Sequence, residues 1–351
     1  MLYIHSTSCI SAQHTFDDVN LVVLNPVEEN KLLAVEPNSN QIPNAVLRRM
    51  GKAVRMGIKA ALSIVNNQSE LKGIIIGTAN GGMEDCIKFL NQIIVYDEGT
   101  LTPTNFVQST ANNIASQIGL FTANKNYNIT HVHRGLAFEN AVIDAMMLIK
   151  EHPLDNYLLG GVDEISTYNY NISLLDGLYK NEEVKNNNLY EIETAGSVAG
   201  EGAAMFLVNG KKQNSLATLR AIQTIHATDE KIIASNLKDF LASHLADGEK
   251  LDLFLSGENG DCRLNKYTKI TEKIADTTTL RYKHLTGEFP TASALSLWFA
   301  CNFIENKKVP NNMVKTGSIP TEINTMLIYN NYNGIQHSFV GKPMKVIKFI
   351  P

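Results

Sequence analysis

The sequence predicts an α/β fold in which strands and helices alternate along the chain. Short apolar runs such as Leu71–Gly77 and Tyr157–Gly161 end in glycine-rich turns, as buried strands do. Segments with apolar residues at helical spacing, such as Ala45–Val65, lie between these runs. A composition of 44% hydrophobic and 19% charged residues is that of a globular chain able to bury a full core.

The predicted elements follow one another in order. Ala45–Val65 is predicted as a helix because its apolar positions share one face and its lysines and arginines the other. Pro103 opens a further segment, and the Asn-rich stretch Tyr179–Tyr190 is predicted as an exposed loop. The other predicted strands are Tyr127–Val132, Ala203–Val208, Leu216–Ile225, Leu251–Ser256 and Thr325–Tyr329. The other predicted helices are Ser109–Gly119, Leu136–Lys150, Asp229–Ala246 and Ala292–Glu305.

Charge and hydropathy exclude several classes of function. A formal net charge of −4 with no basic run gives no electrostatic basis for binding nucleic acid. No apolar stretch is long enough to span a membrane, and the N-terminus has no signal-peptide pattern. The four cysteines are scattered and form no CxxC pair, so we expect free thiols in a reducing cytoplasm and no zinc site.

Five turns carry recognisable motifs and occur in a fixed order. They are GTANGG at Gly77–Gly82, a TP…N segment from Leu101 to Asn112, GGVDE at Gly160–Glu164, AGEGA at Ala199–Ala203 and KHLTG at Lys283–Gly287. In this order the turns resemble the landmarks of the β-ketoacyl synthases, the condensing enzymes of fatty-acid and polyketide synthesis. There is no dinucleotide fingerprint, P-loop or GxSxG motif, so we expect neither nucleotide binding nor α/β-hydrolase chemistry, and no cofactor.

The resemblance implies a thiolase-like five-layer αβαβα sandwich of two similar halves, residues 1–210 and 211–351. It also implies a dimer formed through the edge strand, here Asn126–Thr130. The loop Asp97–Asn112 is then expected to reach the neighbouring subunit and to place Phe106 near the partner's acyl tunnel.

The residues that match the family's catalytic positions have the wrong chemistry for condensation. Ketosynthases use a cysteine thiolate at a helix N-terminus, two histidines and a lysine. The family has the pattern T-A-C-x-x-G around its cysteine. Aligning Thr130 and Gly135 with the first and last residues of this pattern places Val132 at the cysteine position. We expect the N-terminus of a buried helix there. A register one residue different would place His131 or His133 there.

The two histidine positions and the lysine position also have counterparts. Glu258 takes the place of the first histidine, with Asn259 as the other candidate, and Glu288 takes the place of the second. Lys283 alone matches a catalytic residue.

The substituted residues suggest a pocket that neutralises itself. His131, His133 and Arg134 bring positive charge, and Glu258 and Glu288 bring negative charge. Because buried charges must be paired, we interpret these residues as structural ion pairs, with a new catalytic site as the alternative. His131 and His133 at i, i+2 could contact a metal, but no third ligand is evident, so no metal is expected.

The resemblance therefore implies a cytoplasmic, non-condensing subunit similar to chain length factors. The motif around Arg134 and the one from Lys283 to Glu288 look like those of the short ketosynthase-like proteins of aryl-polyene and flexirubin-type pigment pathways. The partners implied are an active ketosynthase subunit (heterodimer) or a second copy (homodimer), together with acyl carrier protein. The alternative is a ketosynthase-fold enzyme that uses Glu258, Glu288, His133 and Lys283 in another reaction of acyl thioesters.

Overall fold

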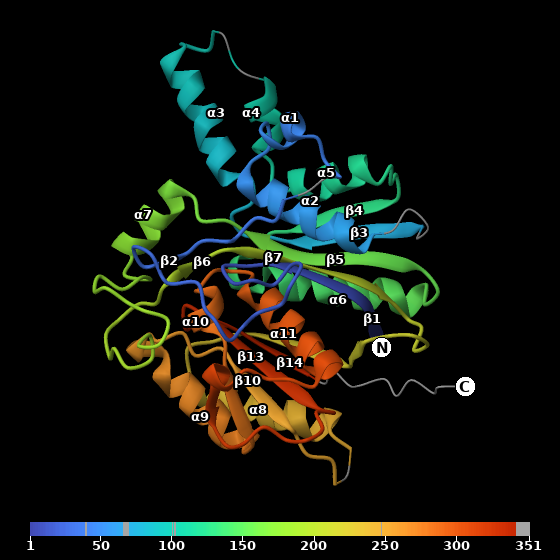
Figure 1. The fold of residues 1–351 in the computed structure, drawn as a ribbon, viewed down its shortest axis with the longest axis vertical. Helices are drawn as coiled ribbons and strands as arrows, with labels where there is room; N and C mark the ends of the chain where they lie inside the picture. Colours follow the sequence, from blue (N-terminus) through green and yellow to red (C-terminus); the bar gives the residue numbers. More distant parts are fainter. Residues whose placement is uncertain (39–40, 66–69, 100, 102, 247, 342–351) are drawn as a thin grey trace.

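The computed structural model describes residues 1–341 except 39–40, 66–69, 100, 102 and 247. Within these residues the chain forms two six-stranded sheets with helices between them and on both outer faces (Figure 1). This arrangement confirms the predicted α/β fold of two similar halves. Among the described residues, no helix is both long and apolar enough to cross a membrane.

The first sheet has the strand order β4-β3-β5-β7-β1-β8. The strands β4, β3 and β5 are parallel, whereas β7, β1 and β8 are antiparallel to their neighbours. Their bounds are β1 (Leu2–Ile10), β3 (Leu71–Gly77), β4 (Tyr127–His131), β5 (Asn156–Asp163), β7 (Gly202–Asn209) and β8 (Ala217–Leu219).

The second sheet repeats this pattern in the order β12-β11-β10-β13-β14-β9. The strands β11, β10 and β13 are parallel, β14 and β9 are antiparallel, and β12 adds an outer antiparallel strand. Their bounds are β9 (Ala221–His226), β10 (Leu253–Ser256), β11 (Thr278–Arg281), β12 (Val314–Thr316), β13 (Met326–Tyr332) and β14 (Gln336–Gly341). A small parallel pair joins β2 (Lys31–Leu32) to β6 (Ala199–Gly200). The proposed division at residues 210 and 211 falls between β7 and β8 and stays a prediction.

The helices form three layers around the two sheets. Helices α2 (Lys52–Ile64) and α5 (Asn113–Phe121) cover the outer face of the first sheet, and α8 (Glu230–His244) and α9 (Asn265–Ala275) cover that of the second. Between the sheets lie α6 (Ala137–Glu151) and α11 (Ala292–Asn306), each of which contacts both. The remaining helices are α1 (Asn44–Leu47), α3 (Met83–Val95), α4 (Pro103–Gln108), α7 (Thr167–Leu175) and α10 (Lys283–Thr286), with 3-10 turns η1 (Arg134–Leu136), η2 (Cys262–Leu264) and η3 (Asn311–Met313).

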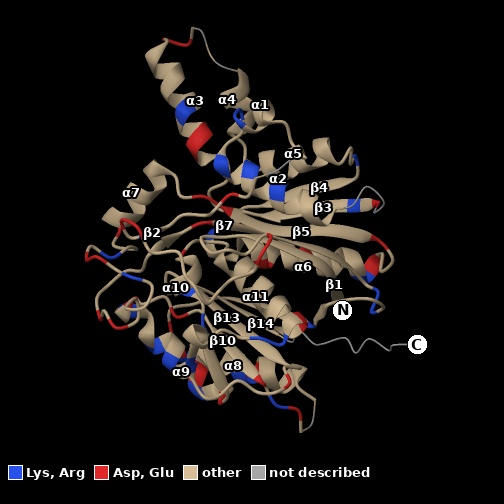
Figure 2. Ribbon diagram, viewed as in Figure 1, with Lys and Arg blue, Asp and Glu red and all other residues tan. Residues whose placement is uncertain are grey.

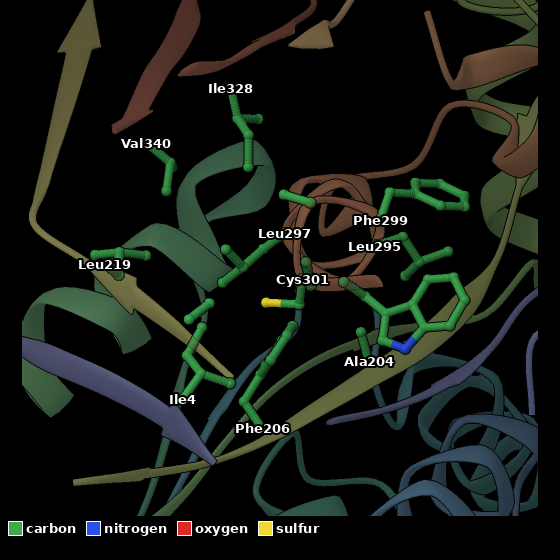
Figure 3. Close-up of a cluster of buried hydrophobic side chains, with 14 of the residues drawn as sticks. Ile4, Ala204, Phe206, Leu219, Leu295, Leu297, Phe299, Cys301, Ile328 and Val340 are labelled. Atoms are coloured by element: carbon green, nitrogen blue, oxygen red, sulfur yellow. The ribbon is translucent and has the colours of Figure 1, made fainter. Parts of the chain in front are cut away.

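The largest core cluster surrounds α11, which is buried at every position from Ala292 to Cys301. Leu295 and Cys301 of this helix pack among Phe206 of the first sheet and Ile328 of the second (Figure 3). A helix that contacts a sheet on each side is buried on both sides, and this explains why the first ten residues of α11 include no charged residue.

Several elements differ from the sequence predictions. The predicted helix Ala45–Val65 is interrupted at Gly51, which caps the N-terminus of α2. The strands β1, β11, β12 and β14 and the helices α7 and α9 were not predicted. The predicted strand Leu216–Ile225 was wrong as a single strand, because the chain passes there from β8 of the first sheet to β9 of the second. The stretch Tyr179–Tyr190 contains no helix or strand, as expected, but Lys180, Val184 and Leu189 within it are buried. Thr102 of the TP…N segment lies outside the described residues.

Candidate functional site

The motifs at Gly77–Gly82, Gly160–Glu164 and Lys283–Gly287 come together at the carboxyl ends of the parallel strands. Asp163 links the first two motifs to Thr291, four residues after the third, because its buried carboxylate accepts hydrogen bonds from Thr78 Oγ1 (3.0 Å), from Asn80 N (2.8 Å) and from Thr291 Oγ1 (2.8 Å). Burial raises the pKa of Asp163, and these hydrogen bonds partly offset that rise. Asp163 belongs to the GGVDE motif, which is recognisable in the sequence. Its role as the link between the two halves was not predicted.

Three buried side chains form the centre of the site. Lys283 Nζ lies 2.6 Å from Glu288 Oε1, and Asn259 Nδ2 donates to Glu288 Oε2 at 2.8 Å. The side chain of Lys283 is 0% exposed and that of Glu288 only 9%. Each carboxylate oxygen of Glu288 is therefore engaged by a donor, and the buried lysine has its counter-charge.

The backbone of Glu288 is also held in place. Its N–H donates to Val198 O (2.7 Å), and its carbonyl accepts from Gly200 N (3.1 Å). A side-chain carbon on Gly200 would lie 2.0 Å from Thr286 O, so the AGEGA turn requires glycine where it crosses the KHLTG turn.

Asn259, and not Glu258, occupies the position beside Glu288. Glu258 points elsewhere and pairs with Lys315 (2.8 Å) and Arg281 (3.6 Å). The placement of Glu258 in the pocket was therefore wrong, and the other candidate is correct. Glu258 and Asn259 are adjacent in the sequence. The geometry of the turn that follows β10 determines which of their side chains points towards Glu288.

Val132 lies in the connection between β4 and η1, and its side chain is 55% exposed. The prediction of a buried helix N-terminus at Val132 was wrong, since α6 begins only at Ala137. The physical reason is that β4 is the edge of its sheet, so that the chain itself has no element to cover this connection. The connection does pack inwards at Gly135, whose N–H donates to Gln336 Oε1 (2.9 Å) in β14.

Three basic residues near the end of β4 do not enter the pocket. His131 Nε2 pairs with Asp144 Oδ2 at 3.0 Å, and His133 Nδ1 lies 2.9 Å from Asn140 Nδ2. Arg134 is exposed and forms no ion pair with any residue that the structure describes. The predicted pairing of Arg134 with Glu258 or Glu288 was wrong, and Lys283 alone neutralises Glu288. Of the four residues of the enzymatic alternative, Lys283 and Glu288 are in contact, whereas Glu258 and His133 have other partners.

Tyr332, at the turn between β13 and β14, was missed by sequence reasoning as a member of this region. Its ring packs so closely on Gly135 that a side-chain carbon on that glycine would lie 2.2 Å from Tyr332 Cβ. Burial raises the pKa of Tyr332, and the nearby groups Tyr179 and Glu288 add to the rise. The signal in the sequence that could have found it is the turn Tyr332-Asn333-Gly334, which stands where the ketosynthases that the sequence resembles have a glycine-rich loop.

None of the four cysteines takes the place of the missing nucleophile. Cys9 and Cys301 are buried in strand β1 and helix α11, and burial raises the pKa of Cys9 to about 12. Cys86 and Cys262 are half-buried on α3 and η2. Within the described part of the chain, no cluster of three metal-ligating side chains is found.

The segment of residues 97–112 carries the short helix α4 and not only a loop; Thr100 and Thr102 lie outside the described residues. Phe106 on α4 is 59% exposed, and its ring packs at a tilt against Phe89 of α3 with ring centroids 5.3 Å apart. Helices α3 and α4 extend from the body of the molecule (Figure 1). Apolar side chains of these helices remain exposed, namely Leu90, Ile94, Val95, Phe106 and Val107.

A separate cleft of about 670 Å³ opens between the start of α2 and the helices α3 and α4. Figure 2 marks Lys and Arg positions in blue on the ribbon of α2 and α3, beside an acidic position of α3 in red. The basic lining residues are Arg48, Arg49, Lys52, Arg55 and Lys88. Lys52 pairs with Glu201 and Arg55 with Glu36, whereas Arg48 and Arg49 are exposed and have no ion pair among the described residues.

The comparisons with known proteins agree with this geometry. Residues 26–179 match the family model of the β-ketoacyl synthase N-terminal domain. A β-ketoacyl synthase from Burkholderia phymatum STM815 has 13% identity and a TM-score of 0.77, over 98% of this chain and 99% of that chain. The ishigamide ketosynthase/chain length factor has 14% identity and a TM-score of 0.74, over 98% of each chain.

A ketosynthase in complex with its chain length factor from Xenorhabdus doucetiae also has 14% identity, with a TM-score of 0.73 over 98% of each chain. No curated protein sequence matches the chain. At this level of identity the structural likeness establishes the fold, which is the thiolase-like ketosynthase fold.

Proposed function

We propose that this chain, a ketosynthase-like protein with the thiolase fold, is a non-condensing subunit similar in role to chain length factors. It would assist acyl-chain elongation on acyl carrier protein in a cytoplasmic fatty-acid or polyketide pathway of the aryl-polyene type. The observation that carries the proposal is the sequence from Thr130 to Gly135, which by its resemblance to the family's pattern assigns Val132 to the cysteine position. A valine side chain has no atom that can form a thioester.

The buried trio supports the same conclusion. Decarboxylative condensation needs donors that stabilise an enolate or oxyanion. Glu288 as the ion-pair partner of Lys283 has only acceptor oxygens, and both are already occupied. One amide N–H of Asn259 donates to the same carboxylate. The two donors of this trio, Lys283 and Asn259, are both directed at the carboxylate of Glu288.

The edge of the first sheet supports a role in a pair of subunits. The strand β4 has an unpaired edge, and Tyr127 and Val132 beside it are exposed. The exposed apolar residues of α3 and α4 add to this surface. An open edge with apolar neighbours is expected to be covered by another subunit. We propose an active ketosynthase subunit as that partner, with a second copy of this chain as the alternative.

The basic cleft supports contact with acyl carrier protein. That partner carries its acyl chain through a phosphodiester, so a cationic surface favours it. Arg48 and Arg49 supply the unneutralised charge, because the other cations of the cleft have carboxylates close by. One complex of a type II polyketide synthase acyl carrier protein with its ketosynthase also has this fold, with 13% identity and a TM-score of 0.70 over 98% of this chain and 99% of that chain.

The test is whether the purified chain forms an acyl-enzyme. It is incubated with acyl-CoA and with acyl carrier protein thioesters, and its intact mass is then measured. We expect no adduct of acyl mass, while an active ketosynthase under the same conditions serves as the positive control. A stable adduct on any of the four cysteines would show that the chain has its own acyl-transfer chemistry, and the non-condensing proposal would be wrong.

A further inference from the structure

Two cations flank the open edge strand β4. Lys125 lies two residues before the strand, and Arg134 lies three residues after it. Both side chains are exposed. Among the described residues, neither cation has a carboxylate within ion-pair distance. The open edge therefore carries an unneutralised positive charge at each end.

The nearest acidic residue of this face is already occupied. Asp144 of α6 accepts a hydrogen bond from Tyr127 OH (3.0 Å) and lies 3.0 Å from His131 Nε2. Both of these partners belong to β4, so Asp144 tethers the strand to the helix behind it. It forms no ion pair with Lys125 or Arg134.

The backbone at Arg134 has a strained conformation, although the Arg134 side chain has no ion-pair partner among the described residues. Its φ is +45°, in the left-handed region, and it begins η1 instead of ending a helix as Asp276 and Lys307 do in the same conformation. Arg134 gains no ion pair within the described chain in exchange for this strain. Strain at an exposed, unpartnered residue points to a contact outside the chain.

Self-pairing through β4 would bring like charges together. Two copies related by a two-fold axis continue the sheet as antiparallel strands. When the axis passes near Ile129, the centre of β4, position 134 of one copy lies opposite position 124 of the other. Arg134 of each copy then lies next to Lys125 of its neighbour, and symmetry makes this happen twice. Like charges placed across such a pair destabilise it.

We propose that the cations at the two ends of β4 disfavour self-pairing and select a different ketosynthase-fold subunit whose edge strand is flanked by acidic residues. The proposal rests on the proposed function, in which the chain acts by pairing along this edge. Arginine is suited to the role, since its guanidinium binds a carboxylate with two hydrogen bonds. Repulsion against the wrong partner is a common source of pairing specificity.

The test uses this chain as its own model partner. A double variant, Lys125→Glu with Arg134→Glu, has an acid-flanked edge and should also repel itself. Wild-type chain and double variant are mixed, and the dissociation constants of the mixed pair and of each self-pair are measured by analytical ultracentrifugation. We expect the mixed pair to be about tenfold tighter than either self-pair. The preference should decline as the salt concentration rises.

Two further variants control for poor folding of the double variant and for the change in net charge. Lys125→Glu alone leaves opposite charges facing each other in a self-pair, so this variant should self-associate more tightly than the wild type even if the double variant folds poorly. The control double variant Lys211→Glu with Lys212→Glu makes the same change in net charge on the loop after β7, and should show no preference for the wild type.

The outcomes separate this inference from the proposed function. A statistical mixture of pairs, or no tightening by Lys125→Glu, would overturn the charge selection. An acyl adduct on the wild-type chain would overturn the non-condensing role but leave the pairing result readable.

Discussion

At the scale of single residues, the ion pair of Lys283 with Glu288 is the best-defined feature of the rebuilt site. It is buried, and Asn259 supplies the second hydrogen bond to the same carboxylate. A buried ion pair costs desolvation energy on both partners, so its contribution to stability depends on both being present. The same reasoning explains why Arg134 is not needed in the pocket.

Glu288→Gln should lower the free energy of unfolding by about 3–5 kcal/mol, because it leaves the Lys283 ammonium buried without a counter-charge. Denaturant unfolding measures this loss. The matched control is Glu183→Gln on the exposed loop, where we expect a change within about 0.5 kcal/mol. The double variant Lys283→Met with Glu288→Leu should recover most of the loss. Equal, small effects of both glutamine substitutions would mean that the site is solvated.

At the scale of elements, the start of α2 depends on a residue far away in sequence. Helix α2 has no side-chain cap of its own, and Glu164, which follows β5, accepts a hydrogen bond from Ala53 N at 2.9 Å. Burial raises the pKa of Glu164 to about 7, and the nearby carboxylates Asp85 and Glu201 add to the rise. The cleft beside α2 therefore contains a carboxyl group that titrates near neutral pH.

This raised pKa predicts how stability varies with pH. The unfolded chain releases the Glu164 proton near the ordinary value of 4.5, whereas the folded chain keeps it until about pH 7. The folded state thus binds more protons in this window, and the contribution of Glu164 to stability falls as the pH rises from about 4.5 to 7. Glu164→Gln should therefore be more stable than the wild type at pH 8, by up to about 3 kcal/mol, and indistinguishable from it below about pH 4.5.

Thermal or denaturant unfolding across pH 4–8 measures this difference. Gln keeps an acceptor for Ala53 N, so a loss of stability at every pH would show that the carboxylate itself is needed as a cap. Glu183→Gln again serves as the control and should show no pH-dependent difference.

At the scale of the whole molecule, the exposed surfaces are concentrated on one side of the first sheet. The open edge of β4 and the exposed apolar residues of α3 and α4 belong to the half that contains Val132. Obligate interfaces bury more than about 2,000 Å² in total and are more apolar than transient ones. These surfaces fit a subunit whose working form is a pair.

We expect the chain to co-purify with the active ketosynthase encoded nearest to it, as a complex burying more than about 2,000 Å². Light scattering at low micromolar concentration reports whether the isolated chain, of mass 38.7 kDa, self-associates. A stable, well-folded monomer that also fails to bind the ketosynthase would contradict the proposal that this chain functions by completing the site of another subunit.

The sequence by itself determined the layered α/β fold and most of its elements. Local patterns suffice for this, because apolar periodicity and glycine turns act within a few residues, as at Leu71–Gly77. The order of the motifs also predicts which positions correspond to the family's catalytic residues, and the assignment of Glu288 and Val132 to such positions stays a prediction. It did not predict α7, whose residues are all at least partly exposed and show little periodicity.

Only the tertiary structure decided which of these residues meet. The choice between Glu258 and Asn259 depends on which way the chain turns after β10, and one residue of register reverses the direction of a side chain. The separation of His131, His133 and Arg134 from the pocket follows from β4 being an edge strand, which is a property of the assembled sheet. Neither fact is local, since each depends on residues that are distant in the sequence. Asn259 contacts Glu288, 29 residues later, and Glu288 N–H donates to the carbonyl of Val198, about 90 residues earlier.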